Sequence, residues 1–279
     1  MKVVKNIAIK GKHKKPILMD LFYEENHRPK QIVIFCHGYK GYKDWGAWNL
    51  VAQEFAKQDT FFVKMNFSHN GGTNEQPIDF PDLEAFGNNN FTIELDDLDS
   101  VINWVVQNDL IKNEIDTNQI TLIGHSRGGG IVLLKASEDN RITKVITWAG
   151  VSDFGSRFPF GEELKIWKKN NVAYITNART NQQMPHYYQF YLNFKENETR
   201  LNIKRAVNKL NIPYLVIHGS DDETVLIQEA NNLFSWNSKN TIHIIEKTNH
   251  TFGSKQPWDS KKLPLDLEEV VNKTADFLK

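Results

Sequence analysis

Residues 120–130 read Ile-Thr-Leu-Ile-Gly-His-Ser-Arg-Gly-Gly-Gly, and the chain continues with Ile-Val-Leu-Leu. The first four residues are typical of a buried strand, and the apolar segment after the glycines is typical of a helix. Between them lies the pattern Gly-x-Ser-x-Gly, with Ser126 at its centre. A serine at the tip of a tight strand-to-helix turn is strained, and the residues two positions away on each side have to lack side chains. Because Gly124 and Gly128 meet that need, the stretch predicts such a turn.

On both sides of this turn, short β-branched runs alternate with longer segments of helical periodicity. The predicted strands are Val3–Ile9, Ile17–Tyr23, Gln31–Cys36, Thr60–Asn66, Ile120–Ile123, Lys144–Trp148, Pro213–His218 and Thr241–Ile245. The predicted helices are Trp48–Gln58, Phe91–Asn108, Gly128–Ser137, Val225–Leu233 and Leu265–Leu278. This alternation predicts an α/β fold, with a mainly parallel central sheet flanked by helices. The first two strands are expected to form an antiparallel start to the sheet.

One interval breaks this rhythm. Between Gly150 and Asn211, about sixty residues show no clear strand–helix unit and are rich in Phe, Tyr and Trp. Loops of that length in a compact domain are usually functional or form small substructures of their own. We therefore expect a single domain, residues 1–279, with a cap-like insertion at about 151–211 over the strand ends. The alternative is that these aromatic side chains only fill the core.

Composition limits the class of partner. The chain has 34 Lys and Arg against 34 Asp and Glu. Its formal net charge is therefore zero, and no overall positive charge attracts it to nucleic acid or to an anionic membrane. Its single cysteine, Cys36, excludes an internal disulfide and a thiolate metal cluster. The N-terminus lacks the apolar run of a signal peptide, and no later run has the length of a membrane span. We expect a cytoplasmic protein with a small or amphipathic neutral partner, and neither nucleic acid nor membrane as a partner.

The turn around Ser126 has a chemical consequence. It places the serine at the positive end of the following helix, where N–H groups favour negative charge that develops on a substrate oxygen. A serine hydroxyl is a poor nucleophile at neutral pH, so an imidazole has to take its proton and a carboxylate has to orient that imidazole. The alternative is that a glycine-rich turn merely joins a strand to a helix.

Four histidines follow the serine: His186, His218, His243 and His250. His243 lies within a predicted strand and His218 ends one, which favours satisfied structural roles for both. His186 lies in the predicted insertion and is a weaker candidate for the base. His250 follows the last predicted strand, in a loop at the carboxyl end of the sheet, where ligands bind in doubly wound folds. We therefore predict His250 as the base.

Three consecutive acidic residues, Asp221, Asp222 and Glu223, come directly after a predicted strand. Only one of these carboxylates can point at the imidazole, and the residues alone leave the choice open. Asp221 has a second interpretation, because it also suits the cap of the helix that follows.

In this order of elements and motifs, the chain resembles the α/β-hydrolase superfamily, in which the nucleophile precedes the acid and the acid precedes the histidine. The superfamily's acid is the Asp of a His-Gly-x-x-Asp-x-x-Val segment. That pattern falls on Asp222, with Asp221 as the fallback. The resemblance therefore implies a catalytic triad of Ser126, Asp222 and His250.

Residues 37–45, His-Gly-Tyr-Lys-Gly-Tyr-Lys-Asp-Trp, look like the oxyanion loop of small bacterial carboxylesterases, including feruloyl- and cinnamoyl-esterase-like members. An acyl-transfer site needs backbone donors aimed at the tetrahedral oxygen. One is the N–H of Arg127, the residue after the nucleophile. The resemblance implies the N–H of Tyr39 as the second donor, and it implies that His37 fixes the loop.

The resemblance covers nearly the whole chain and extends to serine aminopeptidase-like and dienelactone-hydrolase-like relatives. A dienelactone hydrolase would carry Cys at position 126 and a haloalkane dehalogenase would carry Asp, so Ser126 argues against both activities. We predict a serine hydrolase, a carboxylesterase that works through an acyl-enzyme.

Several alternatives stay open at this point. Peptidase or thioesterase activity at the same site is the main one, because a triad serves ester, thioester and amide bonds alike. A ligand-binding protein without catalysis is another. We expect no cofactor and no metal, since the histidines lack the spacing of metal ligands. The residues do not select the acyl group, the leaving group or the oligomeric state.

Overall fold

The computed structural model describes residues 1–279. Its strands are β1 (Lys2–Ile9), β2 (Ile17–Tyr23), β3 (Lys30–Cys36), β4 (Phe61–Asn66), β5 (Ile115–His125), β6 (Ile142–Trp148), β7 (Val172–Thr176), β8 (Gln183–Tyr187), β9 (Tyr214–Gly219) and β10 (Asn240–Ile245). Its α-helices are α1 (Trp48–Lys57), α2 (Leu83–Gly87), α3 (Phe91–Gln107), α4 (Arg127–Glu138), α5 (Gly161–Asn170), α6 (Gln189–Glu196), α7 (Ile203–Lys209), α8 (Ile227–Ser235) and α9 (Leu265–Leu278). A 3-10 turn covers Gly155–Arg157.

Eight strands form one sheet in the order β1-β2-β4-β3-β5-β6-β9-β10. β2 runs antiparallel to both of its neighbours, and every other pairing in this sheet is parallel. The predicted α/β fold and its antiparallel start are therefore confirmed. The parallel strands bring their carboxyl ends to one edge, and this edge carries the turn around Ser126.

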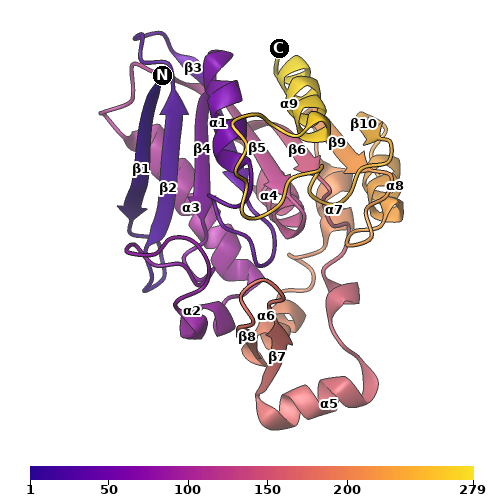
Figure 1. Ribbon diagram of the computed structural model, residues 1–279. Helices are drawn as coiled ribbons and strands as arrows, with labels where there is room; N and C mark the ends of the chain where they lie inside the picture. The colour runs from indigo at the N-terminus through magenta and orange to yellow at the C-terminus, as the bar shows by residue number, and fades with distance from the viewer.

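Helices cover both faces of this sheet (Figure 1). α1 and α9 pack on one face, and α3, α4, α7 and α8 pack on the other. β3 shows how the two cores arise, because Ile32 and Ile34 face the larger core while Val33 and Phe35 face the smaller one. Its unbroken apolar run is thus buried on both faces, as expected for an inner parallel strand. None of the nine α-helices has both the length and the apolar composition that a bilayer crossing requires.

The interval between β6 and β9 has small elements of its own. α5, an antiparallel hairpin of β7 and β8, and α6 follow one another before α7 returns to the sheet. Figure 1 shows this insertion at one end of the sheet, with α5 farthest from it. Phe154, Trp167 and Phe194 are buried, whereas Phe160 is 87% exposed. The aromatic residues that stood out in the sequence therefore divide between core and surface.

Several boundaries differ from the sequence prediction, most of them by one or two residues, and two of the differences have a clear physical cause. β5 begins at Ile115 rather than Ile120, because a polar stretch extends the strand along β3 with a shift in register. α8 begins at Ile227 rather than Val225, because the Val225 N–H donates to the Asp222 carboxylate and completes a turn before the helix.

On α3, Asp97 is a buried carboxylate without a cationic partner. Its Oδ2 accepts a hydrogen bond of 2.7 Å from the Ser68 N–H, and its Oδ1 has no partner. Burial raises the pKa of Asp97 to about 7. Since the pKa in the folded state exceeds that of the unfolded chain, this group's contribution to stability is complete at acid pH. It is lost as the pH rises through 7.

We expect Asp97→Asn to change the pH dependence of unfolding. An amide keeps an acceptor for Ser68 but cannot ionise. The free energy of unfolding of the variant, relative to that of the native protein, should therefore rise by about 2–3 kcal/mol between pH 5 and pH 8. Urea unfolding of both proteins at the two pH values measures this difference, and any pH-independent cost of the amide cancels. An equal difference at both pH values would contradict the prediction.

Candidate active site

Ser126 lies at the sharp turn between β5 and α4. Its backbone has φ 56° and ψ −122°, a strained combination for a residue with a side chain. A Cβ at Gly124 would lie 2.2 Å from the carbonyl oxygen of Gly128, and a Cβ at Gly128 would lie 2.5 Å from that of Cys36. A side chain at either position would clash with the backbone, so both positions require glycine, as the sequence pattern suggested.

His250 and Asp222 meet beside this turn. The Nδ1–H of His250 donates to Asp222 Oδ2 over 2.7 Å. The other carboxylate oxygen accepts from the N–H groups of Thr224 and Val225, both at 2.8 Å. Asp221 is exposed and accepts from the hydroxyl of Ser220 instead. The structure thus brings Asp222, and not the fallback Asp221, to the imidazole.

The carboxylate of Asp222 is ionised at neutral pH. Burial on its own would raise its pKa, but the hydrogen bond and charge of His250, together with the two N–H donors, hold the pKa below its usual value. An ionised Asp222 accepts a hydrogen bond from Nδ1–H of the imidazole, so that Nε2 of a neutral His250 carries no proton and has its lone pair free.

Ser126 and His250 line the same cleft, whose volume is about 430 Å³. No hydrogen bond joins the serine hydroxyl to the imidazole in this structure, where the side chain of His250 bonds to Asp222. Catalytic hydrogen bonds are often long before substrate binds and tighten in the complex. The cleft has the size of a site for a small molecule.

His125, the residue before the serine, supports the loop that carries His250. Its Nε2–H donates to the backbone oxygen of His250 over 2.9 Å, and the two rings lie 4.8 Å apart. Burial lowers the pKa of His125 to about 3, so it is a neutral donor. Sequence reasoning missed this role because nothing in Gly-x-Ser-x-Gly indicates what the second residue contacts.

The other three histidines make their hydrogen bonds with other groups, although His218 Nε2 also lies 3.4 Å from Asp222 Oδ2. His218 Nε2–H donates to the Val225 oxygen over 2.7 Å, but its Nδ1 is buried without a partner, so the prediction of a satisfied residue holds for one nitrogen only. His243 contacts Glu269. His186, the weaker candidate for the base, bonds to the hydroxyl of Tyr39.

The loop after β3 packs against the nucleophile. A Cβ at Gly38 would lie 2.8 Å from the Cβ of Ser126, which shows how closely the loop approaches. The N–H of Tyr39 in this loop makes no hydrogen bond. The N–H of Arg127 belongs to the first turn of α4, where backbone donors lack an acceptor within the helix. Both predicted donors are therefore free to bind an oxyanion.

His37 binds within its own loop, as predicted for a residue that fixes it. Its Nδ1–H donates to the Gly38 oxygen over 2.8 Å, while its Nε2 is buried without a partner. Burial lowers the pKa of His37 to about 4. A neutral ring bonded to the next backbone carbonyl holds the loop rather than exchanging protons.

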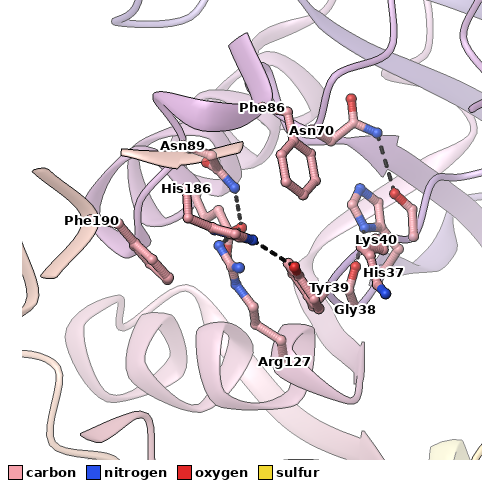
Figure 2. A pocket seen from close by; sticks show the side chains of 12 residues that line it. His37, Gly38, Tyr39, Lys40, Asn70, Phe86, Asn89, Arg127, His186 and Phe190 are labelled. Carbon is pink, nitrogen blue, oxygen red and sulfur yellow. Dashed lines mark hydrogen bonds and ion pairs between the residues drawn. The ribbon is translucent and has the colours of Figure 1, made fainter. Parts of the chain in front are cut away.

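Tyr39 connects this loop to the insertion. Figure 2 shows its hydroxyl and the ring of His186 pointing toward one another. The hydroxyl and Nε2 share a hydrogen bond of 2.6 Å, and burial lowers the pKa of His186 to about 4, so the ring is neutral at neutral pH. The pocket around them has a volume of about 20 Å³, which is room for about one water molecule. Of the two pockets, only the larger cleft has room for a small molecule.

The side chain of Arg127 packs beside the same pocket. Its guanidinium pairs with Glu94 at 2.5 Å and lies 4.9 Å and 5.1 Å from the ring centroids of Phe91 and Phe190. Contacts of this kind hold the first residue of α4, and hence its N–H, in one position.

A buried ion cluster anchors the far end of the loop. Asp20 accepts from Lys43 at 2.9 Å and from Lys64 at 2.8 Å, and all three side chains are fully buried. Asp44 completes the cluster through both lysines. Burial lowers the pKa of Lys64, yet the two acids and two lysines balance in charge. Asp20 and Lys64 each interrupt an apolar strand, a signal that could have revealed a buried pair.

Comparison with known proteins identifies the family. A family model described as BD-FAE matches residues 19–236, which is most of the chain. The chain belongs to the BD-FAE family. The match and the fold confirm the resemblance to α/β hydrolases drawn from the sequence, and this BD-FAE chain has the fold of that superfamily.

Individual relatives of the BD-FAE chain are more distant. An uncharacterized peptidase, YtmA, of Bacillus subtilis (strain 168) is 28% identical over 117 residues, which cover 42% of this chain and 40% of YtmA. Est1E from Butyrivibrio proteoclasticus has a TM-score of 0.69 at 15% identity, over 99% of this chain and 98% of that one. Est1E has also been solved with ferulic acid bound.

A dienelactone hydrolase from Anabaena variabilis ATCC 29413 has a TM-score of 0.65 at 14% identity, over 99% of this chain and 96% of that one. At such low identities, the solved structures show a shared fold and nothing finer.

Proposed function

We propose that this BD-FAE chain is a serine carboxylesterase, with Ser126 as nucleophile, His250 as base and Asp222 as acid. The observation that carries the proposal is the bond between His250 and an ionised Asp222 at the edge of the cleft that Ser126 also lines. These are the groups that activate an alcohol for acyl transfer.

In the proposed reaction, Nε2 of His250 takes the proton of Ser126 as the serine oxygen attacks the ester carbonyl carbon. The N–H groups of Tyr39 and Arg127 donate to the resulting oxyanion. The imidazolium then gives its proton to the departing alkoxide, which leaves an acyl-enzyme. In the second half, His250 takes a proton from water as the water oxygen attacks the acyl-enzyme. The imidazolium then returns that proton to the departing oxygen of Ser126, and the acid is released. Asp222 stays ionised throughout and steadies the imidazolium.

We further propose that the insertion at about 151–211 acts as a cap over a small acyl substrate. The turn between β7 and β8 supports this proposal, because Asn177 and Arg179 line the cleft together with Trp45, Trp48 and Phe80. Aromatic walls of this kind suit an apolar or aromatic acyl group.

A fluorophosphonate probe tests the serine mechanism. The activated serine oxygen displaces fluoride from phosphorus, so we expect mass spectrometry to find the label on Ser126 of the native protein and no label after heat denaturation. 4-Nitrophenyl butyrate should then be hydrolysed with a burst of nitrophenol as the acyl-enzyme accumulates. A label on another residue, or none in the native protein, would rule the proposal out.

Peptidase activity is the second candidate, because the relative YtmA is named a peptidase. A panel of aryl, alkyl and feruloyl esters beside aminoacyl 4-nitroanilides separates the two activities. Turnover of the anilides alone would assign the same residues to amide cleavage and overturn the ester specificity.

A further inference from the structure

The charged side chains that line the cleft are all of one sign. Lys40, Arg179 and Lys255 line it, and no Asp or Glu does. The balanced charge of the whole chain hides this local excess, because charge balance says nothing about where charges lie. A cleft with walls of low dielectric focuses the field of such charges toward a ligand.

Two of these three cations have no acidic partner. Arg179 pairs with Asp79, which offsets its charge. Lys40 and Lys255 form no ion pair with any carboxylate of the protein, and Lys40 Nζ instead lies 5.5 Å from the ring centroid of Tyr39. The charge of Lys40 adds to burial and to Arg127 in lowering the pKa of His186, so it acts on this part of the site.

The two unpaired lysines line the same cleft as the nucleophile. Lys40 follows Tyr39 in the loop after β3, which packs against Ser126. Lys255 lines the same cleft from the loop that follows His250. The cleft that Ser126 lines therefore combines aromatic side chains with two cations that come from different loops.

From this arrangement we propose that the substrate is an anionic ester, one that carries a carboxylate beside the scissile bond, with Lys40 and Lys255 as the residues that select it. This inference rests on the proposed esterase function and names its substrate class. It replaces the neutral partner that composition alone suggested.

Matched ester pairs test the inference. The first pair is 4-nitrophenyl hemisuccinate and 4-nitrophenyl butyrate, and the second is 4-acetoxybenzoate and its methyl ester. In each pair we measure the ratio of kcat/KM for the anionic ester to that for the neutral one. We expect the native ratio to exceed one for at least one pair and to fall as salt rises. In Lys40→Gln/Lys255→Gln it should drop about tenfold, mostly through KM. Lys239→Gln, an exposed lysine before β10, is the matched control and should leave the ratio unchanged.

Calorimetry separates a failure of this inference from a failure of the esterase proposal. Native protein should bind 4-hydroxybenzoate more tightly than 4-hydroxybenzamide, and the double variant should lose that preference, whether or not any ester is hydrolysed. If neither the binding preference nor the kinetic ratio responds to the double variant, selection of anions is excluded, while hydrolysis of neutral esters would leave the proposed function standing.

Discussion

Asp222→Asn should lower kcat for ester hydrolysis by about 10³–10⁴-fold with little change in folding. The Asn oxygen can still accept from the N–H groups of Thr224 and Val225, which leaves its NH₂ facing His250. An NH₂ donor turns Nδ1 of the imidazole into an acceptor and moves its proton to Nε2. The nitrogen that would take the serine proton is then already protonated, so the triad fails through the wrong tautomer.

Asp221→Asn is the matched control for this prediction, because the substitution is the same and the site is one residue away. Asp221 is exposed and contacts Ser220 rather than the imidazole, so kcat should stay within about twofold. Initial rates with 4-nitrophenyl butyrate at saturation measure both variants. Equal losses in the two, or a near-normal rate in Asp222→Asn, would refute the role of Asp222.

Asp20→Asn should lower the free energy of unfolding by about 3–5 kcal/mol, the largest expected effect on stability. The substitution leaves Lys43 and Lys64 fully buried with Asp44 as their only carboxylate. Two desolvated ammonium groups then share one negative charge, and neither can reach water. Urea unfolding measures the loss.

Restoring the charge balance should recover part of this stability. In Asp20→Asn/Lys64→Gln one lysine faces one carboxylate, so the double variant should be more stable than Asp20→Asn alone. Glu54→Gln serves as the surface control, since Glu54 pairs with Lys57 in solvent and its loss should cost under about 1 kcal/mol. A double variant less stable than the single one would mean that packing, and not charge, holds this cluster.

The ion cluster also bears on the proposed catalysis. Lys43 and Asp44 belong to the loop that presents the N–H of Tyr39, and Lys64 donates to the backbone oxygen of Lys43 over 3.0 Å. The cluster therefore fixes one end of the loop to β2 and β4, while Gly38 packs on Ser126 at the other end. A backbone donor held at both ends keeps its direction when charge develops on substrate, which is what preorganisation requires.

Local pattern was enough to predict the sheet and the turn around Ser126. Strand and helix periods are set by neighbours within a few residues, and the glycines at 124 and 128 are required by the turn itself. The small elements of the insertion were not predicted, because β7 is largely exposed and β8 contains Pro185, so neither shows the period of a buried strand.

The sequence by itself determined the fold class, the strained serine and a short set of partners for it, since each follows from local periodicity, local sterics or the order of motifs. Only the tertiary structure showed that Asp222 contacts the imidazole while Asp221 does not, paired His125 with the loop of His250, and gathered unpaired lysines at one cleft. Some of these contacts join residues that are far apart along the chain. Others depend on which way two neighbouring side chains point. They depend on how the chain packs in space, and a one-dimensional pattern does not carry that geometry.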